Sequence, residues 1–352
     1  MLFSIIKKKT VKHIFIIQLV ILIVINYSCT KECDCDELVL KKDTYYLDKK
    51  PFTGVCYDEI YGLKKEKHFE NGKYNGKYIV WDKEGNKVCE SFFKEGKMEG
   101  LTTIWFENGQ KYFESYYKRG NKDGTAIVWY ETGNKKSEEQ YKNGVKDGAS
   151  YEWYPGGNKK SEEHYKDGLK HGEWIVWYEN GTQKESGKYE NGKEYGKWMT
   201  WYEDGQKKSE KNYEDGLENG EWKEWHNNGH LKASGLFEKG FEQGSWVLYY
   251  SDGTKKKEIN FVKGKEHGKT KEWYPDGKIK SEQNFINGVP NGQAKSWYPN
   301  GKLKSVIEFK NGVVNGNYIR YDENGRVIEK STYKNGKKVV IKEEDDKETP
   351  VF

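Results

Sequence analysis

The feature that most constrains the fold of this chain is the spacing of its glycines. After residue 50, glycine recurs at three positions of a 24-residue period. The three series run from Gly72 to Gly336, from Gly76 to Gly316 and from Gly85 to Gly325, with a glycine at every 24th residue. Self-similarity at one fixed period is typical of repeat proteins, in which each repeat packs against its neighbours. The sequence therefore predicts a tandem array.

Aromatic residues keep the same period. A tryptophan column begins at Trp81, and Tyr249 and Tyr321 stand at two of its positions. A second column of phenylalanine and tyrosine runs from Phe69 to Tyr333, always three residues before a glycine of the first series. Large rings that recur on neighbouring strands can cover one another. We expect these stacked rings to form the core of a sheet that is one layer thick.

One repeat, residues 172–189, reads GEWIVWYENGTQKESGKY. It divides at Glu179-Asn180-Gly181 and joins the next repeat through Glu190-Asn191-Gly192. Asn-Gly predicts a hairpin turn because both residues tolerate positive φ. The segments between the turns alternate as strands do, and no sustained 3.6-residue periodicity indicates a helix. The predicted fold is all-β, an elongated array of antiparallel β-hairpin repeats of 24 residues that forms a single twisted meander sheet.

The composition suits such an array. Hydrophobic residues make up 34% of the chain and charged residues 33%, but 13 tryptophans, 27 tyrosines and 14 phenylalanines supply large buried area per residue. The net charge of +5 is spread along the 352 residues. Because no segment is strongly basic, we do not expect a nucleic-acid partner.

The N-terminus has the pattern of an export signal. Lysines at positions 7–9 and 12 precede an apolar run over 14–25, which is too short to span a membrane comfortably. Ser28-Cys29 then resembles a relaxed bacterial lipobox, although Asn26 replaces the aliphatic residue of the strict pattern. The resemblance implies that Cys29 carries a lipid and that the mature chain is anchored to a membrane. The acidic residues after Cys29 resemble a surface-export signal, which places the protein at the cell envelope, in the outer membrane or on the cell surface.

These patterns divide the chain into four parts. We assign residues 1–28 to a signal peptide and 29–50 to a lipidated tether. Residues 51–341 form the repeat array, which has a partial N-terminal cap and about eleven repeats. Residues 342–352 form a disordered acidic tail.

The repeat resembles a known family. Residues 192–198, GKEYGKW, and 201–205, WYEDG, are similar to the MORN repeat in the variant found in bacterial proteins labelled YwqK-family antitoxins. The opening Pro51-Phe52-Thr53-Gly54 is similar to the start of that variant. The resemblance implies a β-hairpin array that contacts protein or lipid, with an antitoxin role in one bacterial branch.

Two columns are candidates for a binding face. Trp174, Trp198, Trp222 and Trp246 form an extra aromatic column in four repeats, which could stack a ligand but would also serve as core. Lysines at every 24th residue from Lys136 to Lys304 could contact phosphates or lipid headgroups. Glutamates two residues further on, such as Glu138, share their parity, so we expect each of these lysines to pair with its neighbouring glutamate.

No pattern predicts catalysis, a cofactor or a metal. The seven histidines fall at unrelated repeat positions, and His226 and His230 flank a turn instead of sharing a helix face. Cys29, Cys33 and Cys35 lack a second ligand cluster, and the disulfide state of Cys33, Cys35, Cys56 and Cys89 stays open. We expect a non-enzymatic scaffold that binds a protein partner at the envelope. The alternatives are an antitoxin and an array that binds lipid headgroups.

Overall fold

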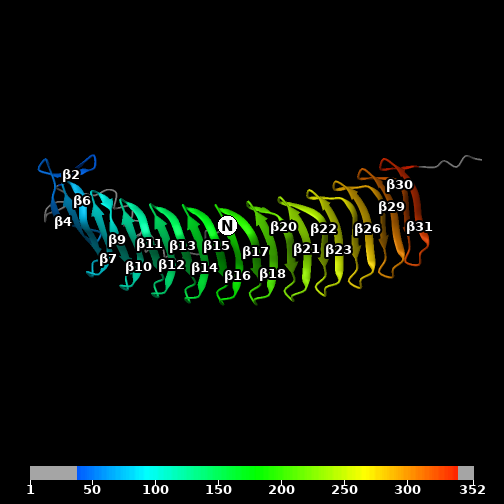
Figure 1. Cartoon of the computed structure of the whole chain (residues 1–352), viewed down its shortest axis with the longest axis horizontal. Helices are drawn as coiled ribbons and strands as arrows, with labels where there is room; N and C mark the ends of the chain where they lie inside the picture. Colours follow the sequence, from blue (N-terminus) through cyan, green and yellow to red (C-terminus); the bar gives the residue numbers. More distant parts are fainter. Residues whose placement is uncertain (1–37, 340–352) are drawn as a thin grey trace, which may run out of the picture. The chain divides into compact units, whose positions relative to one another are not determined.

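The computed structural model describes residues 38–339, and all of its regular structure is β-strand. Consecutive strands lie side by side and antiparallel, as Figure 1 shows, so the predicted all-β meander is confirmed. The chain forms two compact bodies, one that ends at Leu169 and one that begins at Lys170. No helix in residues 38–339 is long and apolar enough to cross a membrane. The predicted signal peptide, Cys29 and the acidic tail lie outside the described residues.

The N-terminal body begins with a small antiparallel sheet of β1 (Val39–Lys41), β2 (Thr44–Leu47) and β3 (Lys50–Pro51). The meander follows as β4 (Gly54–Ile60), β5 (Leu63–Glu70), β6 (Lys73–Trp81), β7 (Lys87–Lys94), β8 (Lys97–Met98), β9 (Gly100–Trp105), β10 (Lys111–Lys118), β11 (Asn121–Trp129), β12 (Lys135–Lys142), β13 (Val145–Trp153) and β14 (Lys159–Lys166). The small sheet caps the first turn, because Tyr45 N–H donates to Gly72 O at 2.7 Å. The segment assigned to the tether therefore contains strands from Val39 onward.

The C-terminal body continues the same pattern. Its strands are β15 (Leu169–Trp177), β16 (Gln183–Glu190), β17 (Lys193–Trp201), β18 (Lys207–Glu214), β19 (Leu217–Glu218), β20 (Gly220–Trp225), β21 (Leu231–Glu238), β22 (Phe241–Tyr249), β23 (Lys255–Val262), β24 (Lys265–Glu266), β25 (Gly268–Trp273), β26 (Ile279–Ile286), β27 (Val289–Pro290), β28 (Gly292–Trp297), β29 (Leu303–Lys310), β30 (Val313–Tyr321), β31 (Val327–Lys334) and β32 (Lys337–Val339). The first residue of β15, Leu169, is the last residue of the N-terminal body.

Each repeat contains two different turns, and in the segment 172–192 both of them read Asn-Gly. Between β16 and β17, Asn191 (φ 50°) and Gly192 (φ 83°) both have positive φ, as the two central residues of a type I′ turn require. Between β15 and β16, only Gly181 (φ 87°) has positive φ, and its N–H donates to Tyr178 O at 3.0 Å. That geometry is a type I turn closed by a glycine bulge. The hairpin turn predicted at Asn180-Gly181 is therefore present, but Asn180 does not take the positive φ that it tolerates, because this longer loop needs only one left-handed residue.

A third glycine bends the strand that follows the type I′ turn. In β17, Gly196 (φ 68°) begins a three-residue segment that faces Gly187 of β16, since Ser186 pairs with Met199 and Lys188 pairs with Tyr195. The bulge lets the strand turn without ending the ladder. It also brings Trp198 over Gly187, where a Cβ would stand 2.2 Å from the indole ring.

The core is a stack of aromatic rings along one face of the sheet, the aromatic face. In the N-terminal body, the ring centroids of Phe69 and Tyr74 lie 4.5 Å apart, and those of Tyr74 and Phe93 lie 5.4 Å apart. In the C-terminal body, Trp198 contacts Tyr189 at 5.1 Å and Tyr213 at 5.9 Å. Because each ring packs on rings of the neighbouring strands, the interior extends from repeat to repeat.

Tyrosine hydroxyls also join neighbouring repeats. A tyrosine that follows the tryptophan column donates from its hydroxyl to the carbonyl 23 residues later, at 2.8 to 2.9 Å. The pairs are Tyr130 with Trp153, Tyr178 with Trp201, Tyr202 with Trp225, Tyr250 with Trp273, Tyr274 with Trp297, and Tyr298 with Tyr321. These bonds fix the distance between successive loops that contain the type I turn.

Candidate binding surface

The tryptophan column predicted as a stacking platform takes part in the core. Trp198 is only 6% exposed and Trp246 only 8%, and each ring lies over a glycine, Gly187 and Gly235 respectively. Trp174 lies 5.2 Å from Trp198, centroid to centroid, and Trp222 lies 5.1 Å from Trp246. Trp246 also donates from Nε1 to Leu236 O at 3.2 Å. Packing therefore accounts for the burial of two of the four rings, while Trp174 and Trp222 are half-buried.

Charged side chains on the opposite face are paired locally, but not in the predicted combination. Glu138 accepts from Lys135 at 2.6 Å and not from Lys136, which lies 5.8 Å above the Tyr130 ring. The cause is a bulge, since Val128 pairs with Ser137 and Trp129 with Lys135, which leaves Lys136 as an extra residue. The bulge shifts the alternation by one residue. The same pairing recurs at Lys87 with Glu90, Lys111 with Glu114, Lys159 with Glu162, and Lys255 with Glu258.

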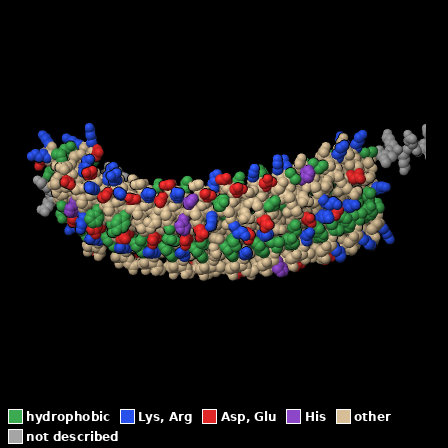
Figure 2. Space-filling model, in the orientation of Figure 1, with side chains coloured by type: hydrophobic (Ala, Val, Ile, Leu, Met, Phe, Trp, Pro, Cys, Tyr) green, Lys and Arg blue, Asp and Glu red, His purple; other side chains and the backbone are tan. Residues whose placement is uncertain are grey.

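Figure 2 shows a band of apolar side chains along this face, with acidic and basic side chains mixed beside it and no large patch of one charge. Lysines of the column that includes Lys136 either lie over tyrosine rings or pair with glutamates of the adjacent strand, such as Lys160 with Glu152 at 2.7 Å and Lys232 with Glu224 at 2.8 Å. Exposed pairs of this kind contribute little to stability. The glutamates do neutralise lysines of the column from Lys136 to Lys304, which was a candidate for contact with phosphates.

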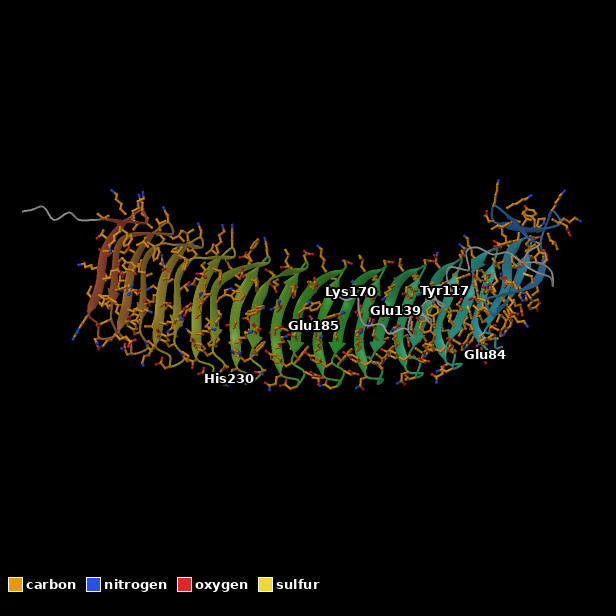
Figure 3. The ribbon with its side chains drawn as sticks, turned by 180° about the vertical axis from the view of Figure 1, so that it is seen from behind. Glu84, Tyr117, Glu139, Lys170, Glu185 and His230 are labelled. Carbon is orange, nitrogen blue, oxygen red and sulfur yellow. The ribbon has the colours of Figure 1, made fainter. Side chains whose placement is uncertain are left out.

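A ladder of charged residues lies on the aromatic face of the N-terminal body. Lys146 Nζ lies 2.7 Å from Glu139 Oε1, and the Tyr141 hydroxyl donates to Glu139 Oε2 at 2.7 Å. Lys122 Nζ lies 4.7 Å from the centroid of the Tyr141 ring. Glu139 and Tyr117, labelled in Figure 3, belong to this face.

The surroundings of this ladder shift the pKa of its members. Burial raises the pKa of the Glu139 carboxyl, but the bonds from Lys146 and Tyr141 outweigh it and hold that pKa below its ordinary value. Burial lowers the pKa of Lys122, and Glu139 offsets only part of the effect. Lys146 and the Tyr141 hydroxyl thus hold the Glu139 carboxylate, and Lys122 lies beside them over the Tyr141 ring.

The C-terminal body contains the same ladder with every charge reversed. Glu194, Lys211 and Glu218 stand 72 residues, or three repeats, after Lys122, Glu139 and Lys146. Lys211 Nζ lies 2.6 Å from Glu218 Oε1, just as Glu139 lies beside Lys146 in the N-terminal body. On the same face, burial raises the pKa of Glu185, which Figure 3 labels, and nearby lysines offset part of the rise. Because one position accepts either sign as long as its partner changes too, the ladder is a packing device rather than a ligand-specific site.

The edge made by the type I′ turns contains a second recurrent device. In most repeats, the residue before the bulge glycine accepts a hydrogen bond from the backbone N–H of the next type I′ turn, 20 residues later. Such bonds join Asn75 to Glu95, Glu99 to Arg119, Asp123 to Asn143, Asp147 to Asp167, Asn219 to Lys239, Gln243 to Lys263, His267 to Asn287, Asn291 to Asn311, and Asn315 to Asn335. At Tyr195 the ring is half exposed and presents no short acceptor to the next turn. One repeat earlier, Nδ1 of His171 is buried without a hydrogen-bond partner.

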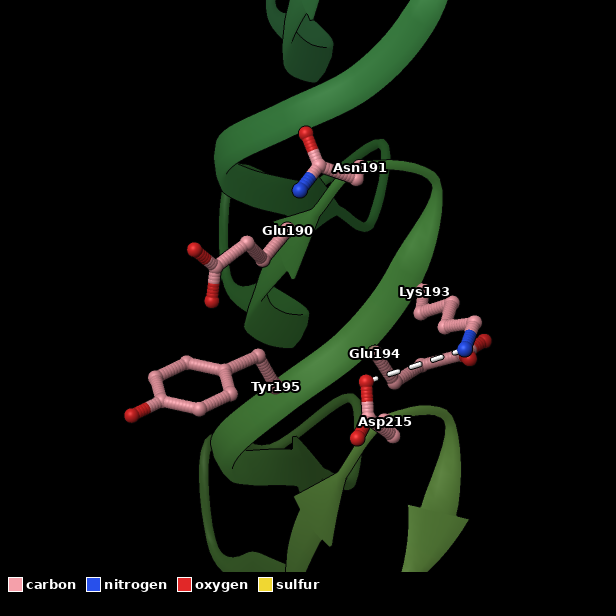
Figure 4. A pocket seen from close by; sticks show the side chains of 6 residues that line it. All are labelled: Glu190, Asn191, Lys193, Glu194, Tyr195 and Asp215. Carbon is pink, nitrogen blue, oxygen red and sulfur yellow. Dashed lines mark ion pairs between the residues drawn. The ribbon is translucent and has the colours of Figure 1, made fainter.

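A hollow of about 350 Å³ opens beside Tyr195. Its lining, drawn in Figure 4, consists of Glu190, Asn191, Lys193, Glu194, Tyr195 and Asp215. Lys193 pairs with Asp215 at 3.6 Å, and the other two carboxylates of the lining belong to Glu190 and Glu194. The Tyr189 hydroxyl lies 3.5 Å from one of them, Glu194.

Exposed apolar side chains follow the type I′ turns and form what we name the turn-edge row. Its members are the apolar residues that directly follow a turn glycine, and in the C-terminal body they are Leu217, Phe241, Val289 and Val313, whereas Lys193 and Lys265 hold the same position in two other repeats. Leu217 is 50% exposed and Phe241 57%. Val145 and Leu169 hold the same position in the N-terminal body and are also exposed. The sequence signal is an apolar residue directly after the turn glycine, which cannot be told from an ordinary first residue of a strand.

Histidines and cysteines do not gather into a site. His226 and His230 contact the carbonyls of Tyr249 at 3.2 Å and Ser251 at 2.9 Å, so they join adjacent loops as the tyrosines do. Within residues 38–339, no three His, Cys, Asp or Glu side chains are grouped as metal ligands would be. Cys56 and Cys89 are buried and are not joined in a disulfide, and burial raises the pKa of Cys89 to about 11.

Fold and surface together define a repeat protein made of tandem β-hairpins. Nine segments match the family described as MORN repeat variant, at residues 98–119, 122–143, 146–167, 170–191, 194–215, 218–239, 266–287, 290–311 and 314–335. Since these segments cover more than half of the chain, the chain belongs to this family. Repeats of this kind are scaffolds that often bind protein or lipid. Residues 242–263 fall between matched segments yet form β22 and β23 in the same pattern.

Other comparisons add little. No curated protein matches the chain. The solved structures similar to it include the crystal structure of TcdB2-TccC3-Cdc42, at 12% identity and a TM-score of 0.15. The crystal structure of TcdB2-TccC3 without its hypervariable C-terminal region gives 12% identity and a TM-score of 0.18. In both cases 78% of this chain is covered but only 18% of the other chain. TM-scores this low do not establish a shared fold.

Proposed function

We propose that this chain is a non-enzymatic scaffold that binds a protein partner along its turn-edge row. The observation that supports the proposal is the exposure of Leu217, Phe241, Val289 and Val313 at the same position of their repeats, where a lysine, Lys265, stands between the two pairs. At about 4.8 Å per strand, equivalent residues of adjacent repeats lie about 9.6 Å apart. Several such side chains in line form an apolar stripe that only a second macromolecule would bury.

The other surfaces are less suited to this role. The aromatic face is filled by its own rings, and its charged groups are paired with one another. The opposite face presents short-range Lys–Glu pairs, which a partner would have to break and desolvate. At the turn edge, exposed apolar side chains such as Leu217 and Phe241 lie beside exposed charged ones such as Asp215 and Lys239, so a partner can bury the apolar side chains while the charged ones stay at the rim of the contact.

We further propose that Cys29 anchors the scaffold to the cell envelope, so that the partner is an envelope protein. Substitution Cys29→Ala is expected to abolish incorporation of labelled fatty acid. Label retained by that variant would contradict the anchor and leave the partner binding untested by this route. A chain without residues 1–28 that acts in the cytosol against a toxin would favour the antitoxin alternative.

Capture of the partner from envelope fractions tests the binding surface. The full chain is compared with Leu217→Ser/Phe241→Ser and with the matched control Val327→Ser/Ile328→Ser, which removes two equally exposed apolar side chains elsewhere. We expect the first variant to lose at least tenfold of the captured partner and the control to lose none. Equal capture by both variants, or salt-sensitive binding to anionic liposomes with no captured protein, would contradict the proposal in favour of lipid contact.

A further inference from the structure

One asparagine at the turn edge lacks a restraint that its counterparts have. Within residues 38–339, Asn-Gly forms type I′ turns at Asn71, Asn143, Asn191, Asn287, Asn311 and Asn335. In all of them except Asn191, the asparagine N–H donates to a side chain earlier in the chain, at 2.9 to 3.5 Å. The acceptor position for Asn191 is occupied by His171, whose Nδ1 is buried and has no hydrogen-bond partner in the described chain. This turn therefore has one hydrogen bond fewer than its counterparts.

The side-chain amide of Asn191 is also weakly held. It is exposed, it lines the hollow of about 350 Å³ that Figure 4 shows, and it makes no hydrogen bond to the described residues. The other Asn-Gly turn of the same repeat differs. There, the Asn180 amide donates from Nδ2 to Glu203 O at 3.0 Å and accepts from Thr182 N–H at 2.9 Å. The same dipeptide is thus held firmly in one turn and loosely in the other.

An asparagine that precedes glycine can lose its side-chain amide, which makes it thermally labile. The glycine main-chain nitrogen gives up its proton and attacks the asparagine Cγ, so that a five-membered succinimide ring closes and ammonia leaves. Water then opens the ring at either carbonyl, which yields aspartate or isoaspartate and a new carboxylate. Ring closure requires that the turn opens and that Cγ reaches the nitrogen. Each hydrogen bond that holds the turn or the amide therefore slows the reaction.

The attacking nitrogen is hydrogen-bonded to a similar extent in the turns compared. Gly192 N–H donates to Lys170 O at 2.8 Å, and Gly181 N–H donates to Tyr178 O at 3.0 Å. Gly312 N–H, in the turn that contains Asn311, donates to a carbonyl at 2.9 Å. Because these bonds are alike, the hydrogen bonds of the asparagine itself decide which turn reacts first.

We propose that Asn191-Gly192 is the site at which the folded chain deamidates fastest. The product adds a carboxylate to a hollow whose lining already includes those of Glu190, Glu194 and Asp215. The isoaspartate form also lengthens the main chain by one methylene group, which does not fit a two-residue type I′ turn, so it loosens the hairpin of β16 and β17. The proposal does not depend on what binds the turn-edge row.

Peptide mapping of the full chain in detergent, incubated at pH 8 and 37 °C, tests the proposal. The rate at each asparagine is divided by its rate in the chain unfolded in urea, which removes the effect of neighbouring residues. We expect Asn191 to react about fivefold faster than Asn311, the effect of one hydrogen bond, and more than tenfold faster than Asn180. Labelling by isoaspartyl methyltransferase provides a second readout. An Asn191 rate no faster than that of Asn311 or Asn180 would overturn the proposal.

The variant His171→Gln supplies the missing acceptor. It copies Gln243, whose Oε1 accepts from Lys263 N–H at 3.0 Å. We expect the substitution to slow deamidation at Asn191 about fivefold. Asn311, which lies five repeats later, serves as the control in the same digest, and its unchanged rate shows that the array remains folded. An Asn191 rate that stays the same while the Asn311 rate is unchanged would contradict the proposal.

The reciprocal variant, Asn291→Ala, removes the acceptor that binds Asn311 N–H at 3.2 Å. The rate at Asn311 is then expected to rise about fivefold, to that of Asn191, while the rate at Asn191 stays the same. An Asn311 rate that does not respond would show that the acceptor does not control deamidation, and the proposal would fail on this result as well.

Discussion

The charge-reversed ladders allow a sharp test of what holds the aromatic face together. We consider Glu139→Lys alone and the triple variant Lys122→Glu/Glu139→Lys/Lys146→Glu, which copies the signs of Glu194, Lys211 and Glu218. The single change removes the contact with Lys146 Nζ at 2.7 Å and places three ammonium groups together. A hydrogen bond to a charged group contributes about 1.5–3 kcal/mol, and the new repulsion adds to its loss. Because these side chains are 23% to 30% exposed, we discount the total to about 3 kcal/mol.

The triple variant restores opposite charges at every contact of the ladder. We expect it to recover all but about 1 kcal/mol, since the tyrosine at this position serves either sign, as Tyr213 does beside Lys211. The remaining deficit is assigned to Glu163, whose counterpart three repeats later is Gly235. Global unfolding of a long array need not be two-state, so the local free energy is measured by hydrogen exchange of amides in β11, β12 and β13. A triple variant as unstable as the single variant would refute compensation; Lys211→Glu serves as the reciprocal control.

Four further predictions concern the core, the loops, a buried thiol and the charged ladder. Gly187→Ala would place a Cβ 2.2 Å from the Trp198 ring, so we expect a loss of about 2 kcal/mol, measured by hydrogen exchange in β16 and β17; an unchanged value would show that the indole moves freely. Tyr178→Phe removes the bond to Trp201 O at 2.9 Å, and the adjacent loops should lose about 1 kcal/mol of protection, whereas no loss would mean that water replaces the hydroxyl. Iodoacetamide at pH 8 should leave Cys89 unmodified in the folded chain and modify it after unfolding, as read by peptide mapping. The reason is that Cys89 is buried and that its pKa of about 11 keeps the thiol protonated. Rapid labelling of the folded chain would contradict this. The depressed pKa of Glu139 implies stability that is fully present above its unfolded value near 4.5 and lost as the pH falls through its folded value, so Glu139→Gln should flatten acid unfolding of β12 between those limits.

Much of the fold follows from period and turn chemistry. Glycines at fixed spacing and Asn-Gly pairs are local signals, and they identified the strands between Gly54 and Val339. They could not distinguish the two turns, because Asn180 and Asn191 carry the same dipeptide and differ only in how many residues close the loop. The pairing of Lys135 with Glu138 was missed for a related reason, since a one-residue bulge at Lys136 reverses side-chain parity without a sequence signature.

The candidate surface was harder to predict. Trp174 and Trp198 are prominent in the sequence, yet the glycine between them, Gly187, decides that they pack instead of projecting. The residues of the turn-edge row, such as Phe241, look like ordinary strand starts until the structure shows that nothing within the described chain covers them fully.

Position-resolved photo-crosslinking in cells tests the central claim most directly. A photoreactive side chain is placed at Leu217, Phe241 or Val289 on the turn-edge row, and at Asp204, His230 or Asp252 on the loops of the opposite edge. A scaffold that binds along the turn-edge row should yield one protein adduct from the first three sites and none from the others. Adducts from the opposite edge, or only lipid adducts from the row, would contradict it.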